Sequence, residues 1–371
     1  MNLVLLAQSC IATLYGPAGK AIVAAVDDLL RARAQQGIAS RAYDPEAGWP
    51  ELGVEPVLLN PPALAAQLAV IDQALRAQGA IIESLTVIGG PQVVPFGELP
   101  NPLPDGDGEL RSDAIYGLAS QSSYIARWPV GRIPDAEPAE PGLLVQLVQT
   151  AARLHQSRSR LPRTFGYSSA HWRDLSADVL GAAPAPVELF ESPPIMPPTL
   201  VRSKLAEASL IYCNLHGVRG GASWYGQAKG DTALIMALRP EDLEAVDLAG
   251  ALVVSQACFG ARLAPQGGQR SLALGFLAGG ARGFVGALAL TYGAISLPIA
   301  ESDQLVRCLF MELADPAVSL GRAFQAAHER MLREVLRRQG FVDAGDMKTL
   351  LEFVLYGDPT LQAGLAFNDR S

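Results

Sequence analysis

One histidine and one cysteine stand where the sequence could support nucleophilic chemistry. The histidine is His216, followed by Gly217, and the cysteine is Cys258, in the run Gln-Ala-Cys-Phe-Gly that ends at Gly260. Each directly follows a short apolar stretch typical of a buried strand. Because parallel strands end at the same edge of a sheet, both side chains are expected at one rim. Their spacing is similar to the roughly 50 residues by which a histidine precedes a Gln-Ala-Cys-x-Gly cysteine.

These residue types fit acyl transfer. A thiolate is a nucleophile, and a neighbouring imidazolium or a helix N-terminus favours its formation. We therefore expect Cys258 to attack a carbonyl carbon and His216 to protonate the leaving amine, with a helix after Cys258 as a second source of activation. The backbone N–H groups of Gly217 and Cys258 are the expected oxyanion donors, and glycine at 217 would let a substrate approach closely.

The alternative to a catalytic role, for any cysteine after a strand, is that of a small apolar core residue. Order, spacing and strand context favour chemistry for Cys258, and the remaining thiols and histidines lack that context. The other thiols lie in or beside apolar runs and are predicted to be core residues: Cys10, Cys213 and Cys308. The other histidines are expected on the surface or on helices: His155, His171 and His328.

The elements that must position His216 and Cys258 are read from short apolar runs that alternate with longer amphipathic ones. The rhythm predicts an α/β fold of three layers (α/β/α) with mainly parallel sheets. Strands are expected over residues 3–8, 85–89, 163–168, 209–214, 251–255 and 283–288. Helices are expected over residues 20–36, 63–78, 141–156, 271–279, 303–314 and 319–338.

Proline-rich stretches divide the chain. We predict an N-terminal α/β subdomain over residues 1–140, a connecting helix over 141–160 and a C-terminal catalytic subdomain over 161–371. Both halves show the strand–helix rhythm, which predicts two related sheets packed together. The segment 101–108, Asn-Pro-Leu-Pro-Asp-Gly-Asp-Gly, is expected to be an exposed loop.

Composition excludes several classes of function. The formal net charge is −8 with a pI of about 5.1, and no basic stripe is present, so nucleic acid is an unlikely partner. The four cysteines form no CxxC pair, which predicts neither a metal site nor a disulfide framework. No cofactor is expected, and the free thiols indicate a reducing, cytoplasmic location.

Two apolar stretches could be mistaken for membrane or targeting segments. The run over residues 3–7 has no preceding basic residue and is short for a signal peptide, so a first buried strand is the better interpretation. Residues 283–300 carry no charge, but their glycines and Pro298 suit a buried strand that leads into a loop. No membrane partner is expected.

The His-Gly and Gln-Ala-Cys-x-Gly pair resembles the caspase-fold (clan CD) cysteine peptidases. The wider chain resembles the gingipain-type peptidases, family C25, from about residue 3 to residue 361. The motifs that carry this resemblance occur in the family's order: Val87-Ile-Gly-Gly90 with Val93-Val-Pro-Phe96, Ser112-Asp-Ala-Ile-Tyr116, Val130-Gly-Arg-Ile-Pro134, His216-Gly217 with Trp224-Tyr-Gly226, Ala257-Cys-Phe-Gly-Ala261, Gly280-Ala-Arg-Gly-Phe-Val285 and Tyr356-Gly-Asp-Pro359.

The resemblance implies a two-part catalytic unit of caspase-like layers with the dyad in the second part. His216 and Cys258 match the family's catalytic pair. Phe259 stands where caspases have Arg, Gln or Gly, so cleavage after aspartate is not implied. The chain shows no secretion signal of the kind that gingipains carry, which implies an intracellular role.

Four further residues are candidates for substrate contact. Trp224, Tyr225 and Tyr292 could wall a pocket or pack in the core. Asp113 could face a basic substrate side chain, orient His216, or hold the proline-rich loop, and the last is favoured.

The function that these observations favour is a cysteine endopeptidase that acts on polypeptide substrates through an acyl-enzyme. The alternative is a regulatory or scaffold protein of the same fold, with little turnover until an activating protein or ligand binds. A third interpretation, a small-molecule site at the turn Ile88-Gly89-Gly90, lacks the GxGxxG spacing.

Overall fold

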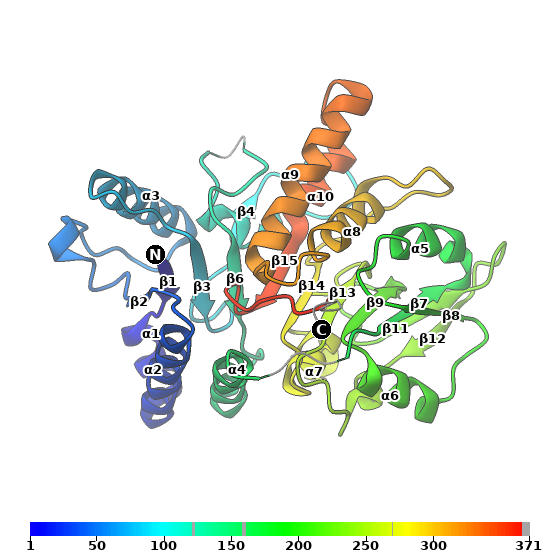
Figure 1. The fold of residues 1–371 in the computed structure, drawn as a ribbon, viewed down its shortest axis with the longest axis horizontal. Coiled ribbons are helices and arrows are strands. Elements are labelled where there is room, and N and C mark those ends of the chain that lie inside the picture. Colours follow the sequence, from blue (N-terminus) through cyan, green and yellow to red (C-terminus); the bar gives the residue numbers. More distant parts are fainter. Residues whose placement is uncertain (121–122, 158–160, 269, 366–371) are drawn as a thin grey trace, which may run out of the picture.

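The computed structural model describes residues 1–120, 123–157, 161–268 and 270–365. Ten strands within these ranges form one continuous sheet between two layers of helices (Figure 1). In order across the sheet they are β2 (Ser40–Tyr43), β1 (Asn2–Leu5), β3 (Ser84–Ile88), β6 (Val130–Ile133), β15 (Phe353–Gly357), β14 (Gly283–Ala287), β13 (Leu252–Ser255), β9 (Leu210–Asn214), β7 (Thr164–Ser169) and β8 (Val187–Ser192).

The sheet consists of two parallel halves that run in opposite directions. Strands β2, β1, β3, β6 and β15 are parallel to one another, and so are β14, β13, β9, β7 and β8. The halves meet at the antiparallel pair β14–β15. The mainly parallel three-layer α/β architecture is thereby confirmed, with one correction: the two halves join edge to edge in one sheet and do not pack as two.

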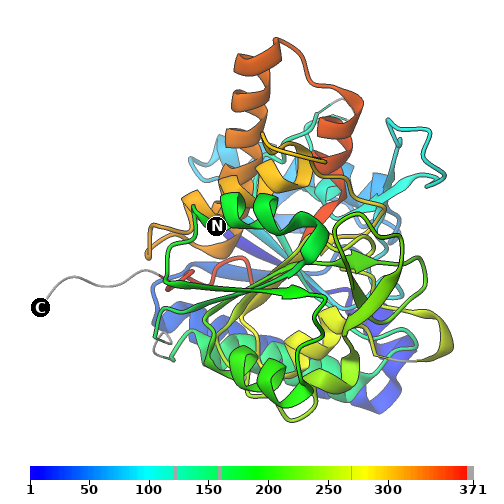
Figure 2. The same ribbon diagram turned by 90° about the vertical axis from the view of Figure 1, so that its right-hand side faces the viewer.

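Helices cover both faces of this sheet, as the turned view also shows (Figure 2). One face carries α3 (Pro61–Ala77), α5 (Arg173–Leu180), α8 (Glu301–Glu312), α9 (Leu320–Gln339) and α10 (Ala344–Glu352). The other face carries α1 (Gln8–Tyr15), α2 (Gly19–Gln35), α4 (Pro141–Leu154), α6 (Pro198–Glu207) and α7 (Leu272–Ala278).

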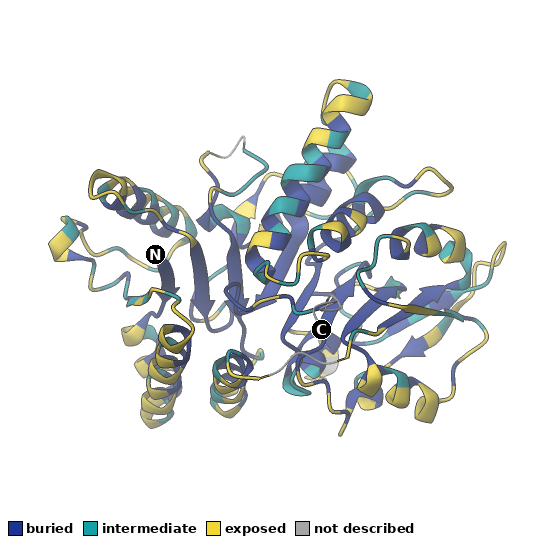
Figure 3. Cartoon of the chain, in the orientation of Figure 1, coloured by how far each residue is buried: buried dark blue, intermediate teal, exposed yellow. Residues whose placement is uncertain are grey.

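Burial explains why the apolar runs become strands. Every residue of β9 and of β13 is buried, as expected for a strand with a helix layer on each face. Figure 3 shows this burial throughout the central strands, while the outer faces of the helices remain exposed. Helix α9 buries one stripe, begins at Ser319, whose side chain accepts from the Arg322 N–H, and ends at Gly340 in the left-handed conformation.

The expected strands and helices are present, with ends displaced by a few residues. The elements that the apolar pattern did not predict are short, half-exposed or directly continuous with a helix: β2, β6, β8, β15, α1, α5, α6 and α10. Two small sheets were also not foreseen, one of β10 (His216–Gly217), β11 (Trp224–Gln227) and β12 (Leu234–Leu238), and one of β4 (Gly97–Leu99) and β5 (Leu110–Ser112).

The predicted subdomain boundaries stay a prediction, and residues 158–160 and 366–371 of those subdomains lie outside the described residues. The apolar stretch 283–300 is strand β14 followed by a loop, as expected. One helical stretch of the described chain, Gln8–Gln35, has the length and hydropathy of a membrane span. It is weak support for one, because core helices pass the same test and α2 buries Ile22, Val26 and Leu29 against the core.

Candidate active site

The ends of β9 and β13 bring the predicted dyad to one rim. These strands are parallel neighbours, with Ser255 opposite Cys213 in the register. The pairing continues one residue further, where the Gln256 N–H donates to the Cys213 carbonyl at 2.8 Å. His216 and Cys258 follow directly after these ends, so the parallel register carries both side chains to the same edge of the sheet.

Gly217 shows how closely the two loops meet. A Cβ on Gly217 would lie 1.9 Å from the carbonyl oxygen of Cys258 and 3.2 Å from its nitrogen. The backbones of the two loops are therefore in direct contact, and only glycine fits. This corrects the reason predicted for this glycine: Cys258 itself, and not a substrate, occupies the space that a side chain would take.

Cys258 is a protonated thiol in this arrangement. Its side chain is mostly buried, and its Sγ–H donates to the Thr291 carbonyl at 3.4 Å. Burial raises the pKa of Cys258 to about 11, and the nearby Glu352 carboxylate acts in the same direction. The predicted helix after Cys258 is absent: the chain makes a turn with Phe259 at a φ of 58°, and α7 begins only at Leu272. Activation by a helix N-terminus is therefore not available.

His216 is held by an amide side chain that the sequence did not single out. Its Nε2 lies 2.9 Å from Oε1 of Gln227, and since an amide oxygen only accepts, Nε2 carries the proton. Nδ1 is then the unprotonated nitrogen, available as a base. The ring also packs on Trp172, with centroids 4.1 Å apart. Burial lowers the pKa of His216, and His171 adds to this, although the bond to Gln227 opposes it.

Gln227 is itself fixed at both ends. Its backbone N–H donates to Ser169 Oγ at 3.0 Å, and its Nε2 donates to the Asp231 carbonyl at 2.5 Å. Ser169 lies at the end of β7, so the neighbouring strand of the main sheet anchors the β11 residue that orients His216. Such an orienting partner fixes which nitrogen of a histidine is the base.

A small cavity of about 60 Å³ opens beside Cys258. Its polar floor includes Asp303, whose oxygens accept from Gln256 Nε2 at 2.9 Å and from the Ala294 N–H at 2.8 Å. Burial raises the pKa of Asp303, and no cation pairs with it among the described residues. The remaining lining residues are Trp172, Leu175, Asn214, Leu215, Thr291, Tyr292, Gly293 and Ser302.

The structure separates the four predicted substrate residues. Tyr292 lines the cavity beside Cys258. Tyr225 is half-buried and pairs with His216 across β10 and β11, but it does not line the cavity. Trp224 is 4% exposed and packs in the core on Phe276, with centroids 6.1 Å apart, so its predicted contact with substrate is corrected to a packing role.

Asp113 braces the turn between Gly89 and Val94 through Arg132, and not the proline-rich loop that was favoured. It is buried, and its two carboxylate oxygens bind the Arg132 guanidinium at 2.8 and 2.5 Å. Arg132 in turn donates to the carbonyls of Gly89 and Val94. Asp113 is not among the residues that line the cavity beside Cys258, and its place among the substrate-binding residues stays a prediction.

Most of the other thiols and histidines are buried or hydrogen-bonded within the protein. Cys213 and Cys308 are buried, and burial raises the pKa of both, to about 12 for Cys308. His155, at the end of α4, is more buried than expected and lies 2.8 Å from an Asp358 oxygen. His328 is buried within α9. In the described part of the chain, no group of three or more His, Cys, Asp or Glu residues could hold a metal ion.

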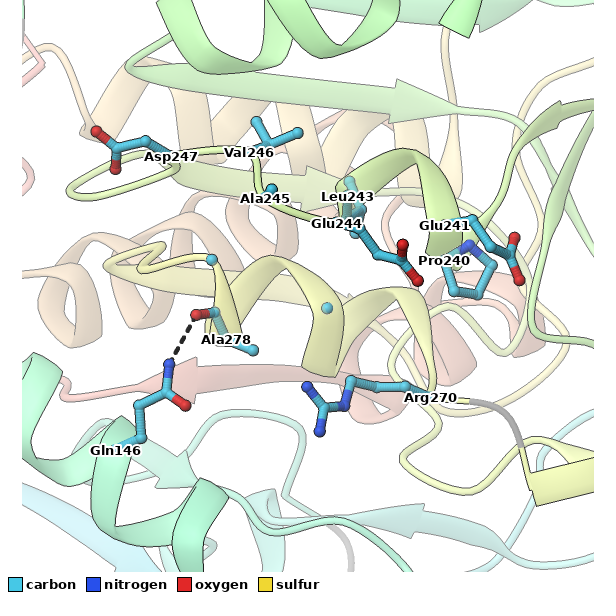
Figure 4. A pocket seen from close by; sticks show the side chains of 12 residues that line it. Gln146, Pro240, Glu241, Leu243, Glu244, Ala245, Val246, Asp247, Arg270 and Ala278 are labelled. Atoms are coloured by element: carbon cyan, nitrogen blue, oxygen red, sulfur yellow. Dashed lines mark hydrogen bonds between the residues drawn. The ribbon is translucent and has the colours of Figure 1, made fainter.

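A larger cavity lies elsewhere. It measures about 700 Å³, is open to solvent, and lies between α4, α7 and the segment 240–247 (Figure 4). Gln146 of α4 donates to the Ala278 carbonyl across it at 2.9 Å. It shares no lining residue with the cavity beside Cys258, and no Cys, His or Ser lines it. Its residues therefore offer no partner for the dyad.

Three solved structures share this architecture. The Arg-specific cysteine proteinase gingipain R (RgpB) aligns with a TM-score of 0.67 and 13% identity over 97% of this chain and 77% of its own. A complex of the pro- and mature domains of RgpB from Porphyromonas gingivalis aligns with a TM-score of 0.68 and 12% identity over 97% of this chain and 79% of its own. A further protease aligns with a TM-score of 0.70 and 11% identity over 97% of this chain and 78% of its own. This chain has the gingipain fold.

The gingipain fold confirms the resemblance inferred from the collinear motifs. No protein-family model and no curated protein sequence matches this chain, so the likeness rests on structure. Within the gingipain fold, the residues that sequence reasoning missed are Gln227 and Trp172. Gln227 directly follows the Trp224-Tyr-Gly226 motif, which is the one local signal that could have pointed to it.

Proposed function

We propose that this chain is a cysteine endopeptidase with Cys258 as nucleophile and His216 as acid–base partner. The observation that carries the proposal is the direct backbone contact between Gly217 and Cys258, which brings the dyad loops together at the rim of a gingipain fold. The small cavity beside Cys258 supports it, because a side chain of a bound substrate could begin to enter there.

The proposed reaction begins from the neutral pair. His216 Nδ1 takes the Sγ proton as sulfur attacks the peptide carbonyl carbon, and the N–H groups of Gly217 and Cys258 stabilise the oxyanion. The C–N bond then breaks while the imidazolium gives its proton to the departing amine. Water, deprotonated by His216, attacks the thioester, which releases the acid product and the free thiol.

The cavity beside Cys258 suggests which side chains precede the cleaved bond. Asp303 is a buried acid with no cationic partner in the described chain, so a side chain that donates hydrogen bonds or carries a positive charge would be favoured there. Profiling cleavage in a peptide library would show this preference, and a preference for acidic side chains would contradict it.

The direct test is covalent labelling with a peptidyl acyloxymethyl ketone probe. Wild-type protein should be labelled and Cys258→Ala should not. Cys10→Ala is the matched control, because Cys10 is the other thiol with partial exposure, and it should label like the wild type. Labelling that persists in Cys258→Ala would refute the assignment.

A second candidate is a regulatory protein of the same fold whose turnover awaits an activating protein or ligand. The observation that favours it is the Cys258 thiol, which donates to the Thr291 carbonyl and whose pKa burial raises to about 11. Wild-type protein that cleaves no library peptide alone, but does so after addition of cell lysate, would support this candidate. We also propose a cytoplasmic location, which the four unpaired cysteines support and which fractionation of cells would test.

A further inference from the structure

The segment that follows β14, residues 288–292, forms one wall around Cys258. On the side of the cysteine loop, the Phe259 N–H donates to the Ala289 carbonyl at 2.8 Å, and the Cys258 Sγ–H donates to the Thr291 carbonyl. The position of the thiol proton therefore depends on where this segment lies.

A single carboxylate from the N-terminal part holds the middle of this segment. The Leu290 N–H donates to Asp107 Oδ2 at 2.7 Å, across 183 residues of sequence. Asp107 belongs to the proline-rich segment 101–108. That segment is a loop, as predicted, with Pro104, Gly106 and Gly108 exposed, but its Asp107 side chain is only 5% exposed. The Asp107 side chain therefore lies against the body of the protein.

The same carboxylate also reaches the histidine side of the site. Its Oδ1 accepts from Nη2 of Arg219, which lies three residues after His216. The Arg219 guanidinium stands over the ring of Phe259, 4.9 Å from the centroid. Asp107 therefore contacts the loop after His216 and the segment beside Cys258 at once.

Lys348 keeps this carboxylate in place and charged. The Lys348 ammonium is buried and donates to Asp107 Oδ2 at 2.9 Å and to Asp105. Burial alone would raise the pKa of Asp107, but Lys348, the Leu290 N–H and Arg219 together lower it. An ionised carboxylate makes the stronger hydrogen bonds that such a brace requires.

We infer that Asp107 is a positioning residue: it ties the loop after His216 to the segment that accepts the hydrogen bond of the Cys258 thiol, and so sets the geometry of the dyad. Asp107 touches no reacting atom and acts through Leu290 and Arg219. The inference rests on the proposed function for its effect on turnover, but its effect on the Cys258 thiol does not depend on it.

The test compares Asp107→Asn with Asp105→Asn in the full-length chain. Asp105 is the comparison, because it shares Lys348 and the same loop and contacts the segment only through the Tyr292 side chain, whereas Asp107 bonds the Leu290 N–H and Arg219. Turnover of a library peptide, the melting temperature, and the rate of Cys258 alkylation by iodoacetamide at pH 8 are measured for both variants. Arg219→Gln provides a second variant that breaks the same link from the other side.

We expect kcat of Asp107→Asn to fall by about 10²-fold with KM changed less than about threefold, because a small misplacement of the dyad affects the chemical step most. The double variant with Arg219→Gln should be no slower than Asp107→Asn alone. Equal kcat for Asp107→Asn and Asp105→Asn, or a kcat loss matched by an equal loss of folded protein, would overturn the inference.

The alkylation rate separates this inference from the proposed function. If wild-type protein shows no turnover, a rate at Cys258 that differs by about tenfold between Asp107→Asn and Asp105→Asn still supports the positioning role. Equal alkylation rates in the two variants would refute that role whether or not the protein is a peptidase.

Discussion

Because His216 donates a hydrogen bond to Gln227, a single substitution of Gln227 can test what sets the protonation state of the histidine. Gln227→Glu replaces a neutral acceptor 2.9 Å from His216 Nε2 with an acid of the same shape. When ionised, it attracts the imidazolium and so favours its protonated form. The variant should therefore raise the pKa of His216, which burial now holds below its usual value.

The size of the effect follows from the separation. Opposite unit charges about 4 Å apart attract by about 4 kcal/mol at an effective dielectric constant of about 20. His216 is half-buried, so solvent and salt screen much of this attraction. A remaining 1.4 kcal/mol or so would favour protonation of the imidazole about tenfold, and would move the acid limb of kcat/KM upward by about one pH unit.

Nuclear magnetic resonance gives a readout that needs no substrate. The chain has four histidines, so the ring signals of His216 can be assigned with a single His216→Ala spectrum. Gln92→Glu adds the same charge at an exposed position near Cys10 and serves as the control. A titration of His216 in Gln227→Glu that coincides with the wild type would show that Gln227 does not set the state of this histidine.

Two further changes test the contact between the loops and the joint between the two parts of the chain. Gly217→Ala places a Cβ 1.9 Å from the Cys258 carbonyl oxygen and should reduce kcat/KM by about 10²-fold, whereas Gly142→Ala, at an open helical position, should leave it unchanged; similar activity of the two variants would contradict the assigned contact. Asp358→Ala leaves the buried Arg33 without its counter-ion and should lower the free energy of unfolding by about 3–5 kcal/mol in denaturant titrations, and a loss below about 1 kcal/mol would refute this. Burial alone would raise the pKa of Asp358, but Arg33 and His155 outweigh it and hold the pKa low in the folded state, so this stability is present above about pH 4 and is lost as the pH falls below that value.

The sequence was sufficient for the parts of the site that local pattern controls. Apolar runs of strand length predicted β9 and β13, and the shared edge of parallel strands then predicted that His216 and Cys258 lie at one rim. The pattern could not tell a core aromatic from a pocket aromatic, because both are apolar residues after strands. For that reason the same prediction was made for Tyr292, which lines the cavity, and for Trp224, which packs on Phe276.

The remaining features depend on contacts between distant segments. Asp107 and Leu290 meet across 183 residues, and no local spacing marks either of them. The protonation state of the dyad also depends on burial, which exists only in the folded chain: the pKa of Cys258 is raised and that of His216 lowered because both side chains are partly shielded from water.

The antiparallel junction of the two halves of the sheet has a consequence for making the protein in pieces. Strand β15, the last strand of the described chain, pairs with β14 on one side and with β6 on the other. A C-terminal fragment expressed alone would keep β14 but would leave the other edge of β15 open, along an entirely buried strand. Such an edge recruits other chains, so the fragment is expected to aggregate. The N-terminal part thus serves the second half as an edge cap, and the two are best produced as one polypeptide.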